Sequence, residues 1–213
     1  MKKIGIIGSG IVAQTLGSGF LAKGHEVMLG SRDVNKLDAW KEKNAKGKTG
    51  TFEDAAVFGD IIVLSVKGLA ASDAIEQAGV QNFNSKTVID TTNPTADAPP
   101  ENGVLKFFTT LDESLMEQLQ ERFPAAHFVK AFNSVGNAYM INPAFTEKPS
   151  MFICGNNDTA KKEVSDILVG FGWEVEDMGK VEASRAIEPL CMLWCIPGML
   201  NNKWNHAFRL IKA

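Results

Sequence analysis

The residues with the clearest chemical pattern lie near the start of the chain, in the run Gly8-Ser9-Gly10-Ile11-Val12-Ala13. This GxGxxA spacing follows a short apolar run and opens a helical pattern, as in the phosphate-binding turn of a dinucleotide-binding βαβ unit. Gly8 permits the tight turn, Gly10 lets the backbone approach a pyrophosphate, and Ala13 lets helix and strand pack closely. The amides at the helix N-terminus then present the positive end of the helix dipole to the phosphates.

The residues after the second strand indicate which dinucleotide is preferred. An NAD site usually carries Asp or Glu about 20 residues beyond the glycines, for the ribose hydroxyls. Here that position is Gly30, and Ser31 and Arg32 follow it, with Lys36 one helical turn further on. A hydroxyl and a guanidinium suit a 2′-phosphate, so the sequence predicts NADP(H) rather than NAD(H). The alternative is a solvated Ser-Arg pair at a helix start.

The other candidate residues come from topology, because ligands of a doubly wound sheet bind at the carboxyl ends of its strands. Asn93 and Asn133 carry amides that suit a ribose or the nicotinamide carboxamide, and either one can equally be a turn-forming residue. Lys67 is either a cofactor contact or a solvated loop lysine. The predicted cofactor-binding residues are Gly8, Ser9, Gly10, Ile11, Val12, Ser31, Arg32, Lys36, Ser65, Val66, Lys67, Asn93, Pro94, Ala131 and Asn133.

Alternating strand-like and helix-like patterns must position these residues. Strands are expected at 3–7, 26–29, 61–65, 87–90 and 128–131, and helices at 11–23, 34–43, 52–58, 70–78 and 111–123, with a loop at 44–50. This rhythm predicts an α/β fold with a Rossmann-type, doubly wound and mainly parallel sheet.

The last third of the chain changes character. We expect a strand at 150–154, a helix at 158–171, a strand at 174–177 and apolar helices at 183–200 and 204–211, the first of them bent or ended at Pro197. The predicted division is a nucleotide-binding domain at 1–145 and a small C-terminal lobe of strands and helices at 146–213, which supplies the substrate cleft and oligomer contacts.

Composition excludes several classes of protein. The 213 residues carry 22 basic and 25 acidic side chains, a formal net charge of −3, so no positive field exists for nucleic acid. The apolar run 189–200 is far shorter than the roughly 20 residues that span a bilayer. The three cysteines are an odd number, which favours reduced packing residues over a disulfide framework or a zinc site. A soluble, cytoplasmic protein with neither nucleic-acid nor membrane partners is expected.

Several segments resemble the coenzyme F420-dependent NADP oxidoreductase family. They are IGIIGSGIVAQTL, the GSR after the second strand, CGNNDTAKKEV, and GWEVEDMGKVEASRAIEPLCMLW. The resemblance implies an NADP-binding Rossmann domain, a small C-terminal lobe and a deazaflavin in the cleft between them. It also implies that Ser31, Arg32 and Lys36 hold the 2′-phosphate, and that the protein forms homo-oligomers, expected to be dimers, through its C-terminal helices.

Side chains for acid–base chemistry are few, so we predict no catalytic residue and no metal site. Tyr139 has Pro143 four residues later, where a Tyr-x-x-x-Lys motif needs lysine, and the histidines His25, His127 and His206 are each better explained by structural roles. An apolar set on the late helix either lines a ring-binding cleft or packs in the core or a dimer contact: Met192, Trp194, Pro197 and Met199.

These observations predict an oxidoreductase that transfers a hydride between NADP(H) and a deazaflavin-like or flavin-like small molecule. F420, a flavin, a quinone-like compound and another small oxidant stay open as acceptors. One alternative is a module that binds NADP(H) and reports redox state without turnover. Another is a reductase resembling 6-phosphogluconate dehydrogenase or pyrroline-carboxylate reductase, which needs a longer helical domain than the chain after 149 can form.

Overall fold

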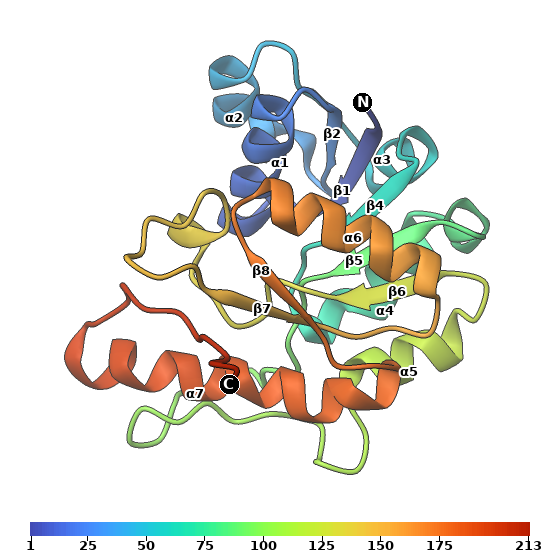
Figure 1. Cartoon of the computed structure of the whole chain (residues 1–213). Helices are drawn as coiled ribbons and strands as arrows, with labels where there is room; N and C mark the ends of the chain where they lie inside the picture. Colours follow the sequence, from blue (N-terminus) through green and yellow to red (C-terminus); the bar gives the residue numbers. More distant parts are fainter.

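A six-stranded, wholly parallel sheet forms the centre of the computed structural model, which describes residues 1–213 (Figure 1). The strand order β3-β2-β1-β4-β5-β6 is that of a Rossmann fold, so the predicted fold class is confirmed. The strands are β1 (Lys3–Ile7), β2 (Glu26–Gly30), β3 (Lys48–Gly50), β4 (Ile61–Leu64), β5 (Thr87–Asp90) and β6 (His127–Lys130).

Two layers of helices cover the sheet. Along β4, Ile61 and Val63 point into one core, whereas Ile62 and Leu64 point into the other, which explains why this strand is a continuous apolar run. The helices are α1 (Ile11–Ala22), α2 (Asp38–Lys43), α3 (Phe52–Phe58), α4 (Ala71–Gln77) and α5 (Leu115–Arg122). Helix α1 packs in the first core, whereas α3, α4 and α5 pack in the second.

The C-terminal part begins with a second βαβ unit, formed by β7 (Ser150–Ile153), α6 (Asp158–Gly170) and β8 (Glu174–Asp177). Helix α6 lies over the main sheet on the side of α1, and its Val164 and Leu168 share a core with Phe20 (Figure 1). The core is therefore continuous across the predicted boundary at 145/146, and that division stays a prediction. The long helix α7 (Ser184–Asn201) follows. No helix is both long and apolar enough to cross a bilayer.

Most element boundaries lie within a few residues of expectation in the first two thirds of the chain, and three differences are worth noting. The edge strand β3 lies within the segment predicted as a loop, because its short polar sequence pairs with β2 through the backbone. The helix predicted at 111–123 begins only at Leu115, since Ser114 and Glu117 form a capping box that fixes its start. Strand β6 lies one residue earlier than predicted.

The C-terminal segment departs most from expectation. Helix α7 continues through Pro197 to Asn201, and residues 204–211 are not helical. Asn202 adopts φ +53° and reverses the chain. The tail then runs beside β7, where Ser150 N donates to the Phe208 carbonyl at 2.9 Å and Leu210 N to Ser150 Oγ at 3.0 Å. Pairing with a strand edge, which is a tertiary contact, overrides the local helical pattern here.

Candidate functional site

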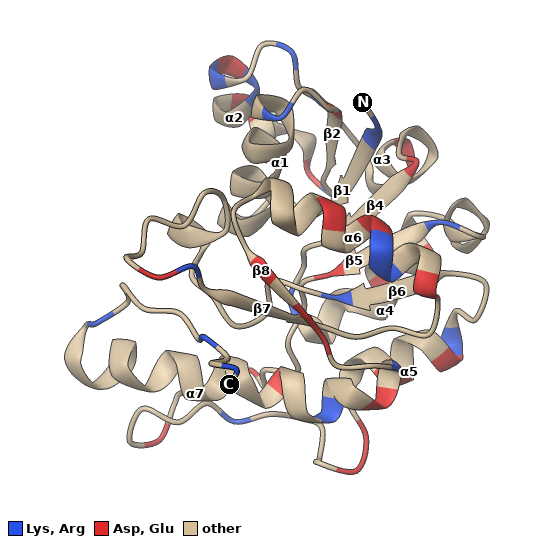
Figure 2. Ribbon diagram, viewed as in Figure 1, with Lys and Arg blue, Asp and Glu red and all other residues tan.

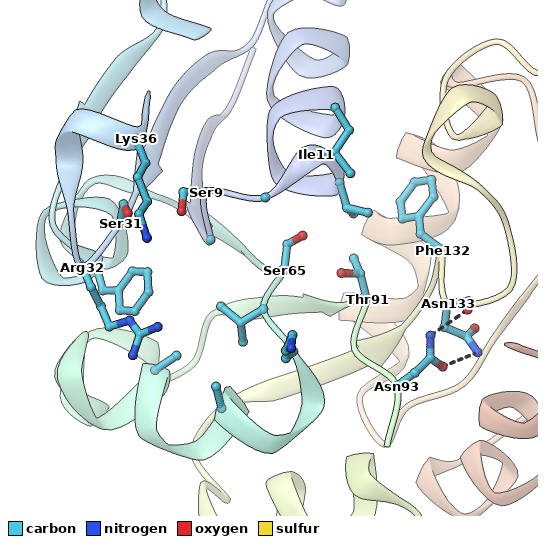
Figure 3. Close-up of a pocket in the computed structure, with 18 of the residues that line it drawn as sticks. Ser9, Ile11, Ser31, Arg32, Lys36, Ser65, Thr91, Asn93, Phe132 and Asn133 are labelled. Carbon is cyan, nitrogen blue, oxygen red and sulfur yellow. Dashed lines mark hydrogen bonds between the residues drawn. The ribbon is translucent and has the colours of Figure 1, made fainter. Parts of the chain in front are cut away.

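A cleft of about 620 Å³ opens at the carboxyl ends of the central strands (Figure 3). It brings together thirteen of the fifteen predicted residues: Gly8, Ser9, Gly10, Ile11, Val12, Ser31, Arg32, Lys36, Ser65, Val66, Lys67, Asn93 and Asn133. Pro94 and Ala131 are the exceptions. Both are buried and do not line the cleft, because they lie behind the residues that form its wall.

The glycine turn between β1 and α1 has the geometry that its sequence predicts. Gly8 has φ +146°, and a Cβ there would lie 2.1 Å from the Ser65 carbonyl oxygen. A Cβ on Gly10 would meet nothing within 4 Å, so this position faces open space in the cleft. Gly10 is the N-cap of α1, no side chain caps the helix, and no acid lies in its first turn. The helix therefore presents uncapped amides and a positive dipole end to the cleft.

One end of the cleft carries unpaired cations (Figure 3). Arg32 and Lys36 are exposed, and neither forms an ion pair. The neighbouring Asp33 uses its carboxylate to accept from Asn35 N at 3.3 Å. Ser31 Oγ accepts from Asp33 N at 3.2 Å, which leaves the hydroxyl proton free to donate. This end can bind a phosphate through two cations and a hydroxyl.

Helix α4 and the segment before it form a wall that sequence reasoning missed. Ala70, Asp73, Ala74 and Gln77 line the cleft, and Phe52 of α3 lies at the same end. Their i, i+3, i+4, i+7 spacing places them on one helical face, and this periodicity was the available signal.

The two asparagines predicted as cofactor contacts form hydrogen bonds mainly with each other and with backbone. Asn93 Nδ2 donates to the Asn133 carbonyl at 2.8 Å, and Asn133 Nδ2 donates to Asn93 Oδ1 at 3.3 Å and to the Ile187 carbonyl at 2.8 Å. They therefore connect the ends of β5 and β6 to α7, as Figure 3 shows for the pair. Asn133 Oδ1 has no partner and is buried.

Phe132, next to Asn133, has an unusual backbone conformation. Its φ is +62°, which is rare for a bulky side chain, and its N–H donates to Met151 Sδ at 3.2 Å. The ring is buried and lines the cleft. Strained residues of this kind persist only where the surrounding packing holds them in place, and they cluster at functional sites.

Helix α7 supplies three side chains to the cleft: Cys191, Trp194 and Cys195. Trp194 is fixed by His206, since the two rings stack at 5.0 Å and Trp194 Nε1 donates to the His206 carbonyl at 2.9 Å. The Cys191 thiol donates to Cys195, which raises the pKa of Cys191, as burial also does, and lowers the pKa of Cys195. Of the apolar set predicted on this helix, only Trp194 lines the cleft. None of the three histidines does.

A buried charge cluster holds α7 against the strand ends. Lys130 Nζ lies 2.7 Å from Asp90 Oδ2 and 2.8 Å from Glu188 Oε1, and all three side chains are buried. Burial alone would lower the pKa of Lys130, but the two carboxylates outweigh this and raise it. The Glu188 carboxylate also accepts from the backbone N–H of Leu115 and of Met116, each at 3.0 Å, at the start of α5.

Comparisons with known proteins agree with this geometry. Residues 3–94 match the model of a family described as NADP oxidoreductase, coenzyme F420-dependent. The chain is 29% identical over 184 residues to the F420-dependent NADP reductase of Methanocaldococcus jannaschii, covering 81% of this chain and 82% of that protein. A candidate F420-dependent NADP reductase from Arthrobacter sp. FB24 has a solved structure with a TM-score of 0.93, 27% identity and full coverage of both chains. The predicted family resemblance is confirmed.

A second relative extends the family likeness to a larger protein. The chain is 29% identical over 204 residues to the metalloreductase STEAP3 of Rattus norvegicus, covering 93% of this chain but only 39% of the rat protein. It therefore spans less than half the length of that relative. The chain is thus similar to NADP-dependent oxidoreductases.

Proposed function

We propose that the protein binds NADP(H) in the 620 Å³ cleft and transfers a hydride between it and a flavin-like or deazaflavin-like ring. The observation that carries this proposal is the polarity of the cleft. Uncapped amides of α1 lie at its centre, two unpaired cations lie at one end, and an apolar and aromatic wall lies at the other.

The residues present fit a phosphorylated dinucleotide. Arg32 and Lys36 would hold the 2′-phosphate, with the Ser31 hydroxyl as a third donor. The open space at Gly10 would admit the pyrophosphate against the amides of α1. The nicotinamide would then lie toward Phe132 and Trp194, where the cleft is least polar. The other predicted contacts, Ser65, Val66 and Lys67, would flank it on the β4 side.

The chain contributes position and exclusion of water rather than acid–base chemistry. The bound nicotinamide supplies the hydride, so the protein needs to orient two rings face to face. The buried clusters around Lys130 and Asn133 fix α7 and the strand ends, so the aromatic wall is held in place before either ring binds. No histidine, and no acid other than Asp33 and Asp73 at the cation end, lines the cleft.

We further propose a cytoplasmic homodimer that forms through exposed apolar side chains of α7 and of the last residues, Leu210 and Ile211. Leu193 and Leu200 are 55% and 57% exposed, and Ile211 is 85% exposed, so more than half of each apolar side chain is uncovered within one chain. Size-exclusion chromatography with light scattering tests this, and a monomer at micromolar concentration contradicts it.

The main experiment measures NADPH oxidation by the purified protein with F420, FMN, FAD and a quinone in parallel, with NADH as the control. Turnover with at least one acceptor, and a preference for NADPH over NADH, is the expected result. Tight NADPH binding without turnover on any acceptor would contradict the proposal and favour the alternative, a redox-sensing module.

A further inference from the structure

A second cavity of about 650 Å³ adjoins the apolar end of the cleft. The two share Val12, Val135 and Trp194, so a ring in the second cavity would approach whatever occupies that end of the first. The remaining lining residues are Gly136, Asn137, Ala138, Tyr139, Asn202, Trp204 and Asn205. A volume of this size suits a compact small-molecule ligand.

The lining of this cavity contains no ionisable side chain other than a tyrosine. Trp194 and Trp204 lie with ring centroids 5.5 Å apart and form an aromatic wall. Figure 2 shows that α7 is tan beyond its first turns, and no charged residue occurs between 189 and 202. Lys203 is exposed and does not line the cavity. The cations that line the first cleft, Arg32, Lys36 and Lys67, do not line this cavity.

Backbone electrostatics also disfavour an anion here. Helix α7 has 18 residues, and its C-terminus, at Asn201 and Asn202, lies at the cavity with no basic residue in the last turn. The carbonyl end of a helix carries a partial negative charge. Asn202 Oδ1 accepts from Trp204 Nε1 at 3.0 Å, which leaves its amide N–H groups to donate to a neutral carbonyl.

We infer that the second cavity binds the acceptor, and that the acceptor is an uncharged, planar, conjugated ring, either a quinone or a flavin ring without a phosphate. This inference rests on the proposed function and narrows its substrate class. In the reaction, the hydride of NADPH would carry two electrons to the ring, one proton would come from water, and the products would be NADP⁺ and the dihydro form of the ring. A phosphorylated acceptor would bring a dianion to a site without a counter-charge.

The test compares pairs of ligands that differ by one added anionic group. Binding of riboflavin and FMN, and of menadione and its sulfonate, is measured by quenching of tryptophan fluorescence with NADP⁺ present, and NADPH oxidation is measured with the same four compounds. We expect the neutral member of each pair to bind about tenfold more tightly and to have the higher kcat/KM. Comparing the affinities of riboflavin and menadione shows which of the two rings, the flavin or the quinone, the cavity prefers. Preference for FMN, the sulfonate or F420 would overturn the inference.

A charge-gain variant provides an independent arm. Asn205 is exposed and lines the second cavity, so Asn205→Lys should fold normally and should raise FMN affinity relative to riboflavin. Asn84 is exposed and precedes β5 at the amino ends of the strands, so Asn84→Lys adds the same charge away from the cavity and should leave the ratio unchanged. An unchanged ratio in Asn205→Lys would overturn the assignment of this cavity. Absence of turnover with all compounds, with NADPH still bound, would instead contradict the proposed function.

Discussion

Replacing Arg32 by alanine tests the assignment of the cation end. Arg32 lines the cleft, is exposed and forms no ion pair within the chain, so its removal leaves no buried charge uncompensated. The folded state should therefore lose little stability, typically within about 0.5 kcal/mol for an exposed site. Any change in ligand binding then reports the contact with the ligand itself.

The magnitude follows from the contact that the guanidinium can make. A charge-assisted hydrogen bond contributes about 1.5–3 kcal/mol, and the exposed position places Arg32 at the lower end. Since about 1.4 kcal/mol is a factor of ten, Arg32→Ala should weaken NADPH binding roughly 10- to 30-fold. The double variant with Lys36→Ala should weaken it further, by less than the product of the two single effects, because both cations address one phosphate.

The assay is calorimetric titration of NADPH and NADH into wild type, Arg32→Ala and the control Lys46→Ala. Lys46 is an exposed lysine outside the cleft and without an ion pair, so it controls for the change in net charge. NADH affinity should change by less than about threefold in all variants, because NADH lacks the phosphate that Arg32 would contact. Equal losses for NADPH and NADH, or equal losses in Arg32→Ala and Lys46→Ala, would refute the assignment.

Three further perturbations address other parts of the site. Gly10→Ala should keep wild-type stability, because its Cβ meets nothing, yet weaken NADPH binding. Gly8→Ala should lower the melting temperature, because its Cβ would lie 2.1 Å from a carbonyl oxygen. Calorimetry measures both effects, and a reversed pattern would contradict the turn geometry. Lys130→Met leaves two buried carboxylates without their cation and should cost about 3–5 kcal/mol in the free energy of unfolding. The folded-state pKa of Lys130 is raised, so its stabilising contribution should be complete below the unfolded pKa of about 10.5 and be lost only as the pH rises beyond that. Denaturant titrations at neutral and alkaline pH measure this contribution, and its loss below about pH 10 would contradict the prediction. Burial raises the pKa of Cys154 to about 12, and the pKa of Cys191 is raised as well, whereas that of Cys195 is lowered. At pH 8 a thiol reagent should therefore modify Cys195 first, and NADPH should protect it; labelling of Cys154 or Cys191 as fast as that of Cys195 would contradict this.

Much of the cofactor end could be predicted from sequence, because its residues are close together along the chain. The glycine turn sits between a strand and a helix, so Gly8 and Gly10 acquire their roles from local geometry. Ser31 and Arg32 follow the adjacent strand directly, and the fixed parallel register brings them to the same edge. The two buried exceptions, Pro94 and Ala131, fail for a local reason, since a strand end places alternate residues behind the wall.

The apolar end was not predictable in the same way. The sequence favours packing roles for Cys191 and Cys195, because the spacing of an apolar helix does not show which face meets the cleft. The path of residues 204–211 depends on a free strand edge that only the folded protein presents. Trp204 reaches Trp194 solely because the chain reverses at Asn202.

The buried charge cluster explains how these distant segments are held in register. Asp90 and Lys130 are direct partners in the β5–β6 ladder, so their pairing follows from the parallel sheet, and Glu188 joins them from α7. The two carboxylates carry one more negative charge than the single ammonium neutralises, and the backbone N–H groups at the start of α5 supply the missing positive partial charge. The cluster thus ties the ends of β5 and β6 to α5 and α7. Because Cys191, Trp194 and Cys195 follow Glu188 within two turns, the same contacts that neutralise a buried charge also fix the wall against which an acceptor ring would lie.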